Sequence, residues 1–206
     1  MRILMIAYPS IGGSGVVATE LARQLARRGH EVHLLAYGVP ARLHDECGLI
    51  HFHPIELPMY PVLPGPEYNA ALTGSLLELV PRLSPEVIHV HYAVPHALAA
   101  DYALTLLQAR VREACLMPGA SFPPALVVTL HGTDVTELGR EPSLNAALTA
   151  ALPRAAALTA PSASLAQSAR EAFTLPSPVA VIPDFVDPSV FFRRDEASLR
   201  QRLAPD

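Results

Sequence analysis

The chain has 206 residues, 50% of them hydrophobic, with a formal net charge of −4 and an isoelectric point near 6.1. This length suits one well-cored α/β domain, and the composition excludes wholesale disorder. The mildly acidic balance offers no basic footprint for nucleic acid or an anionic membrane, so neither is expected as a partner.

Short β-rich runs alternate with helical stretches along the chain, which is the pattern of a parallel sheet covered on both faces. The predicted strands cover residues 3–7, 31–36, 50–57, 87–91, 125–130 and 179–182. The predicted helices cover residues 15–28, 67–82 and 95–109, and further helices alternate with short strands up to residue 182. The predicted fold is therefore a Rossmann-like, doubly wound α/β domain with a mainly parallel sheet.

Prolines and glycines mark the breaks between these elements. Residues 58–66 are punctuated by proline and are predicted to form a loop near a ligand cleft, and residues 110–124 are predicted to form a surface insertion. Gly29 stands where the first helix needs a C-terminal cap.

The two cysteines and the N-terminal residues indicate the cellular compartment in which the protein works. Cys47 and Cys115 are too few and too far apart for a disulfide framework or a zinc site, and they suit a reducing environment. The apolar start is interrupted early by Gly12, and no apolar run reaches the roughly 18–20 residues of a membrane span. A cytoplasmic protein is expected.

A glycine-rich turn, residues 8–15 (YPSIGGSG), joins the first strand to the first helix. Glycines allow close backbone approach to a ligand, and the N-terminus of the next helix favours a phosphate or carboxylate. The turn is neither G-x-G-x-x-G nor a lysine-bearing phosphate loop, which disfavours dehydrogenases and P-loop NTPases. A plain strand–helix turn with Ser14 as N-cap explains it equally well.

Histidines cluster at and near the ends of two predicted strands. His89 and His91 would lie on one face of a strand, His96 follows them, and His51 and His53 form a second H-x-H. No carboxylate or thiolate stands at ligand spacing, so buried histidines bonded to backbone are favoured over a metal site.

The stretch His131-Gly132-Thr133-Asp134 directly follows the strand predicted at residues 125–130. It places donors and an acid at the mouth of the sheet, where parallel α/β folds bind ligands. Asp134 could instead cap the next helix. His131 is harder to explain as a packing residue, and a ligand contact is the favoured interpretation.

Four stretches together resemble glycosyltransferase family 4, in particular its members that glycosylate L-malate. They are residues 8–21 (YPSIGGSGVVATEL), 89–97 (HVHYAVPHA), 129–134 (TLHGTD) and 182–187 (IPDFVD). The resemblance implies the N-terminal domain of a GT-B fold. It also implies a retaining, metal-independent transfer of N-acetylglucosamine from UDP-N-acetylglucosamine to the hydroxyl of L-malate, the first step of bacillithiol synthesis.

The same resemblance implies roles for individual residues. Gly12 and Gly13 would face the donor diphosphate, and His131 would touch the donor sugar near the reacting centre as the catalytic residue. Ser14, Tyr92, Thr129 and Asp134 would lie along the acceptor pocket, with no metal and no cofactor.

Two departures from the family pattern qualify these expectations. Asp184 stands where the family usually has asparagine, which puts a ligand contact by that side chain in doubt. The second departure is that the chain stops at Asp206, about where the family's second domain would start. Residues 1–185 would be the acceptor-side domain, and residues 186–206 a linker and the start of a C-terminal nucleotide-sugar-binding domain. The chain alone is expected to be inactive without that domain as its partner, and the sequence leaves open whether the protein forms a homodimer.

Two alternative functions remain at this point. One is a family 4 enzyme with another acceptor, and the other is a single-domain module that binds an anion or a metal.

Overall fold

The computed structural model describes residues 1–44, 48–57, 67–114, 122–193 and 201–203. The predicted loop at residues 58–66 and both cysteines lie outside the described residues, so those predictions stand untested. Within the described part, no helix combines the length and apolar character that crossing a membrane requires.

The core of the molecule is a seven-stranded sheet whose neighbouring strands are all parallel, in the order β3-β2-β1-β4-β5-β6-β7. The strands are β1 (Arg2–Ile6), β2 (Glu31–Ala36), β3 (Ile50–Pro54), β4 (Val87–His91), β5 (Ala125–Thr129), β6 (Ala157–Ala160) and β7 (Ala180–Val181). The order confirms the Rossmann-like prediction. The chain first builds outward from β1 through β2 to β3, then returns to build in the other direction from β4, so the direction reverses between β1 and β4.

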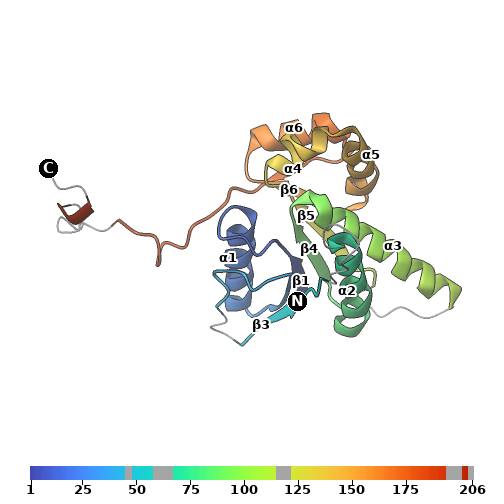
Figure 1. Cartoon of the computed structure of the whole chain (residues 1–206), viewed down its shortest axis with the longest axis horizontal. Coiled ribbons are helices and arrows are strands. Elements are labelled where there is room, and N and C mark those ends of the chain that lie inside the picture. The colour runs from blue at the N-terminus through green and yellow to red at the C-terminus, as the bar shows by residue number, and fades with distance from the viewer. Residues whose placement is uncertain (45–47, 58–66, 115–121, 194–200, 204–206) are drawn as a thin grey trace, which may run out of the picture.

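Helices cover both faces of this sheet, as Figure 1 shows. The α-helices are α1 (Ser14–Arg27), α2 (Tyr68–Leu83), α3 (Leu98–Glu113), α4 (Thr133–Thr136), α5 (Pro142–Ala151) and α6 (Ala163–Phe173). Short helical turns are η1 (Ala93–Ala97), η2 (Leu138–Arg140) and η3 (Leu152–Arg154). One core packs α1 on β1 to β3, and a larger one packs α2, α3, α5 and α6 on the opposite face.

The predicted and observed elements agree closely at β2 and β4, which match residue for residue. The first helix ends as predicted, since Gly29 has φ +83° and donates to the carbonyl oxygen of Ala26 at 2.8 Å. The predicted insertion at residues 110–124 is partly wrong, because α3 continues to Glu113. Its sequence there consists of good helix formers, and the first proline comes only at Pro118.

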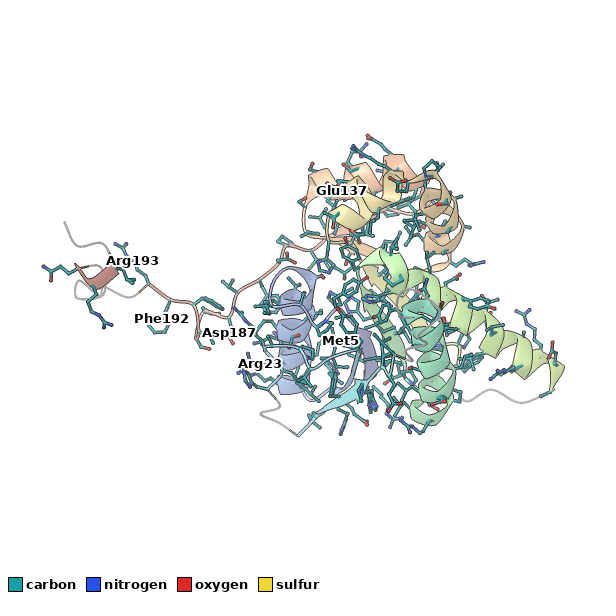
Figure 2. The ribbon with its side chains drawn as sticks, in the orientation of Figure 1. Met5, Arg23, Glu137, Asp187, Phe192 and Arg193 are labelled. Atoms are coloured by element: carbon teal, nitrogen blue, oxygen red, sulfur yellow. The ribbon has the colours of Figure 1, made fainter. Side chains whose placement is uncertain are left out.

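The segment after β7 leaves the sheet and runs past α1 (Figures 1 and 2). It is attached there by Asp187, whose carboxylate accepts from Arg27 Nη1 at 2.9 Å and Gln24 Nε2 at 3.2 Å. Bonds from Ser189 and the charge of Arg27 lower the pKa of Asp187 to about 2. The first residues assigned to the linker thus contact the domain that precedes them.

Candidate functional site

Three loops leave the carboxyl ends of β1, β4 and β5 at one edge of the sheet. They are the glycine turn, the residues that begin η1, and the residues between β5 and α4. The chain reverses between β1 and β4 at this edge, which is where open α/β sheets bind ligands. The structure therefore brings all the site residues predicted from sequence to the same side of the fold.

The glycine turn is exposed where it leads into α1. The helix begins at Ser14 with Gly13 as N-cap (φ 57°), so the expectation that Ser14 caps the helix is wrong. Ser10 takes that part, since its hydroxyl accepts from the backbone N–H of Gly15 at 3.2 Å and donates to the carbonyl oxygen of Gly12 at 2.6 Å. Gly12 and Gly13 are exposed, and a Cβ on either would have no atom within 4 Å.

Gly15 and Gly12 form a matched pair for substitution. A Cβ on Gly15 would lie 2.4 Å from the carbonyl oxygen of Tyr8 and 2.5 Å from the Ser10 hydroxyl, whereas one on Gly12 would meet open space. We expect Gly15→Ala to lower the free energy of unfolding by about 2 kcal/mol or more, and Gly12→Ala to change it by less than about 0.5 kcal/mol. Urea unfolding of both variants checks this, and equal losses would contradict the geometry.

Asp134 holds two of the loops together from a fully buried position. Its carboxylate accepts from the backbone N–H of His131 at 3.0 Å, of Gly132 at 2.8 Å and, across the edge, of Ala93 at 2.9 Å. Without Asp134, these three backbone N–H groups would lack a hydrogen-bond acceptor. The side chain is engaged with backbone on several sides, so its structural part is to position His131 and the start of η1.

Removing that carboxylate is expected to destabilise the domain strongly. Asp134→Ala leaves three N–H groups without their charged acceptor, which should cost about 3 kcal/mol and lower the melting temperature by roughly 6–12 °C for a chain of this size. The exposed Asp184→Asn is the control and should melt within about 2 °C of the parent. A thermal melt of Asp134→Ala that matches this control would show that other groups satisfy the loops.

A second network links histidines at the end of β4. The ring of His96 donates from Nδ1 to the carbonyl oxygen of His91 at 2.6 Å. Its Nε2 is then the acceptor of the Tyr68 hydroxyl at 2.9 Å, because a neutral imidazole has only one N–H. Burial lowers the pKa of His96 to about 4, which keeps the ring neutral in this arrangement.

Beside it, His91 pairs with His131 across the loop gap, with Nδ1 and Nε2 3.1 Å apart. Burial lowers the pKa of both rings, although the carboxylates of Asp134 and Asp184 act in the opposite direction on His131. Asp184, which departs from the family pattern, therefore lies close enough to affect the residue predicted to be catalytic. His131 is partly exposed at the edge, as a ligand contact requires.

Thr129 lies inside the sheet's own hydrogen-bond network. Its hydroxyl is 2.7 Å from His89 Nε2 and 2.8 Å from the hydroxyl of Thr159 on β6. His89 and His91 do share a face, as predicted, with ring centroids 4.5 Å apart. The Thr129 side chain is thus occupied by its neighbours in this structure.

Tyrosines that the sequence did not single out as site residues line the same edge. Tyr8 contacts the rings of Tyr92 (centroids 5.6 Å apart) and His96 (4.5 Å), and Tyr37 and Tyr68 extend this cluster. The hydroxyl of Tyr92 bonds to that of Thr133, and its backbone has φ 83°, which is rare for a residue with a side chain. Tyr37 directly follows β2 and Tyr68 begins α2, positions with no motif to mark them.

The second H-x-H, His51 and His53 on β3, joins a separate cluster with His33 of β2. His33 Nδ1 lies 2.9 Å from His53 Nε2, and its other nitrogen lies 3.2 Å from Glu31. His51 stacks on His33 with centroids 4.9 Å apart. Within the described residues, no group of three or more His, Cys, Asp or Glu is arranged to hold a metal ion.

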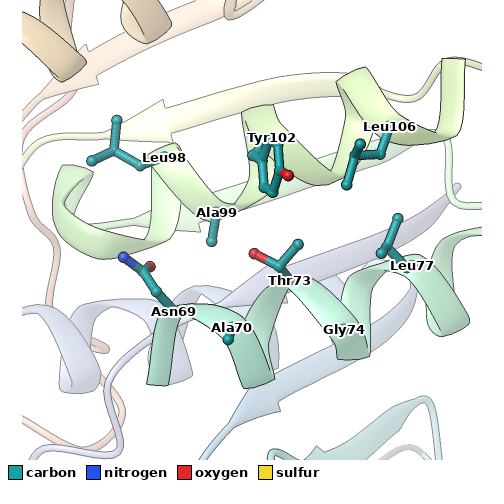
Figure 3. A pocket seen from close by; sticks show the side chains of 9 residues that line it. All are labelled: Asn69, Ala70, Thr73, Gly74, Leu77, Leu98, Ala99, Tyr102 and Leu106. Atoms are coloured by element: carbon teal, nitrogen blue, oxygen red, sulfur yellow. The ribbon is translucent and has the colours of Figure 1, made fainter. Parts of the chain in front are cut away.

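A separate hollow of about 460 Å³ lies between α2 and α3 (Figure 3). Its lining is mainly apolar and is drawn from the two helices, with Tyr102, Leu106 and Leu77 among the larger side chains. None of the strand-end residues described above lines it. The polar chemistry of the domain is therefore at the edge of the sheet and not in this hollow.

Comparison with known sequences finds one family and one curated relative over most of the chain. The family model described as Glycosyltransferase Family 4 matches residues 11–190. The chain is 37% identical over 201 residues to the N-acetyl-alpha-D-glucosaminyl L-malate synthase of Bacillus anthracis. That match covers 98% of this chain and 49% of the relative, so the chain spans about half the length of the curated relative it matches.

Solved structures agree on the fold. A glycosyltransferase from Rickettsia africae superposes with a TM-score of 0.66 at 15% identity, covering 98% of this chain and 49% of the other. The Anabaena protein HepE, solved in complex with UDP-glucose, gives 0.58 at 16% identity, covering 98% and 50%. With the strand order described above, this is the architecture of the N-terminal Rossmann-like domain of GT-B glycosyltransferases.

Proposed function

The chain belongs to glycosyltransferase family 4, and from that membership we propose that it serves the transfer of N-acetylglucosamine from UDP-N-acetylglucosamine to the hydroxyl of L-malate. The observation that carries the choice of substrates is the 37% identity, spread over 98% of the chain, to the Bacillus anthracis L-malate synthase. The geometry of the strand-end loops supports it, because exposed glycines at the start of α1 and a partly exposed histidine lie at the same edge of the sheet.

In this proposal the donor lies across the glycine turn. Gly12 and Gly13 are exposed and leave space for a diphosphate to approach the backbone at the start of α1. His131 would contact the donor sugar from the loop after β5, fixed by the bonds that Asp134 makes to the same loop.

The acceptor would lie between the glycine turn and η1. Ser14 at the first position of α1 and Tyr92 at the end of β4 are the proposed direct contacts. We assign Thr129 and Asp134 to the wall of this pocket, where their side chains hold His89 and the loop backbone. L-malate is a dianion, so the partial positive charge of the α1 N-terminus suits one of its carboxylates.

The proposed chemistry relies on charge stabilisation and positioning. Breaking the glycosyl–phosphate bond builds negative charge on the leaving diphosphate, which fixed N–H donors stabilise. The acceptor hydroxyl would attack on the face that the diphosphate leaves, and its proton would pass to the departing phosphate. The anomeric configuration is then retained without a protein nucleophile or a metal. Because the chain spans half of its curated relative, we propose that the uridine is bound by sequence beyond this half and that residues 1–206 alone do not turn over.

The test is UDP release by the longest natural reading frame that contains this chain. With UDP-N-acetylglucosamine as donor, we expect release that depends on L-malate and is much weaker with D-malate or inositol phosphate. Release that depends on inositol phosphate or on a lipid acceptor would instead identify another acceptor for the same family. No release with any acceptor would favour a non-enzymatic binding module. Measurable turnover by residues 1–206 alone would contradict the need for a second half.

A further inference from the structure

Two histidines from neighbouring strand ends form a hydrogen-bonded pair whose members have very different surroundings. His91 ends β4 and is 1% exposed, whereas His131 is partly exposed at the strand-end edge. Their Nδ1 and Nε2 atoms are 3.1 Å apart. In register, His91 lies opposite Thr129, which places it beside the loop that carries His131.

His91 is held in its neutral form mainly by burial. Complete burial lowers the pKa of His91 well below its usual value. The titratable groups that face it are the imidazoles of His89 on β4, His131 after β5 and His96 on η1, and each opposes a positive charge on His91 in the same direction. The ring therefore has a single N–H to place.

The location of that proton follows from the other ring nitrogen. Nε2 of His91 is buried and has no hydrogen-bond partner in the described part of the chain. A proton on Nε2 would leave a buried donor unsatisfied, which proteins avoid more strictly than an unpaired acceptor. A proton on Nδ1 instead donates to His131 and leaves only an acceptor unpaired. His91 is accordingly the donor of the pair.

This assignment determines what His131 can do. Its Nε2 accepts from His91, so the neutral ring carries its own proton on Nδ1, which makes no hydrogen bond to the described residues. Protonating Nε2 would either place two N–H donors face to face or move the His91 proton to its buried, unpartnered Nε2, so the pair itself opposes a charged His131. We propose that His91 is a positioning residue that holds His131 as a neutral Nδ1–H donor, available to a ligand at this edge of the sheet. Its importance for the reaction rests on the proposed transferase function, whereas the tautomer does not.

The proposal distinguishes a hydrogen-bond donor from a general base. A base needs a free lone pair facing the substrate, and the one lone pair of His131 is engaged by His91. His131 would therefore stabilise charge on a hydroxyl or phosphate oxygen without itself taking up a proton. Because the neutral ring is the active form, the rate should show no loss from deprotonation of His131 on the alkaline side of neutrality, unlike that of an enzyme that uses a charged imidazolium donor.

Two-bond ¹H–¹⁵N NMR of the histidine rings in the ¹⁵N-labelled chain tests this directly, with the His131 signals assigned from a His131→Gln variant. We expect the Nδ1–H tautomer for His131 in the parent chain. His91→Asn, whose amide can still donate near the Nδ1 position, should keep it. His91→Phe, which has no ring nitrogen, should release His131 to a mixture with the Nε2–H form and raise its pKa. His89→Gln is the matched control on the same strand face and should leave the His131 tautomer unchanged.

An Nε2–H tautomer of His131 in the parent chain would overturn the proposal, as would a spectrum that His91→Phe leaves unchanged. If His91→Phe fails to fold, the parent and His91→Asn spectra still decide. In the full reading frame, we expect His91→Phe to lower kcat roughly 10- to 100-fold with a smaller change in KM, and His91→Asn to recover most of it. Absence of transferase activity in the parent would refute the proposed function while leaving the tautomer result valid.

Discussion

Replacing His131 with alanine in the full reading frame should lower the rate of sugar transfer by about 100- to 1,000-fold, the usual loss when a positioned donor to developing charge is removed. The side chain is partly exposed at the strand-end edge, and its ring is oriented by His91 while its backbone is held by Asp134. The loss should appear mainly in kcat, because the interaction strengthens as charge develops in the transition state. Steady-state kinetics of UDP release provides the measurement.

Two controls make that result specific. His44→Gln changes an exposed histidine outside the three loops and should leave the rate unchanged. A thermal melt of His131→Ala should fall by only a few degrees, because the buried N–H of His91 loses its acceptor while the bonds from Asp134 to the backbone are kept. A His131→Ala enzyme with parental kcat would remove His131 from the mechanism, and a grossly destabilised one would show a structural role.

The chain should also lose stability steeply as the pH falls from about 6.5 to 4. Burial lowers the pKa of both His89 and His96 to about 4, from a usual value of 6.5. Between these values the unfolded chain binds protons that the folded chain does not, so each step down in pH favours unfolding. The two residues together should remove on the order of 6 kcal/mol over this window, a large part of the stability of a typical domain. The buried rings of His91 and His33 and the half-buried ring of His53 change in the same direction.

Urea unfolding at a series of pH values measures this loss. His89→Gln cannot take up a proton but keeps an amide near Thr129, so its stability should fall less steeply between pH 6.5 and 4. His44→Gln changes an exposed histidine and should follow the parent curve. A parent chain with the same stability at pH 4.5 and pH 7 would mean that these rings are not buried as the structure has them.

Much of the fold follows from local patterns in the sequence. The strands β2 and β4 are apolar runs bounded by polar residues or turn signals, and their limits could be read directly. Gly29 marks the end of α1 because only a residue without a side chain adopts its φ of +83° easily. The site loops follow from one rule, since parallel strands bring their carboxyl ends to one edge.

The contacts between individual side chains could not be predicted from these local patterns. Asp134 could be assigned to a helix cap or to a ligand, but its bond to Ala93 depends on how two loops approach one another. The same holds for the pairing of His91 with His131, residues 40 positions apart. The tyrosine cluster brings together three separate parts of the chain, at Tyr8, Tyr37 and Tyr68. A single tyrosine in each part gives no periodic signal in the sequence. Contacts of this kind depend on tertiary geometry, which residue patterns do not encode locally.

We propose that this domain presents L-malate to the donor sugar for a retaining transfer. The most direct test is ¹H NMR of the product formed from UDP-N-acetylglucosamine and L-malate by the full reading frame. The proposal predicts a glycoside of the malate hydroxyl with the α configuration of the donor. A β-linked product would contradict the same-face mechanism, and free N-acetylglucosamine with UDP would show that L-malate is not the acceptor.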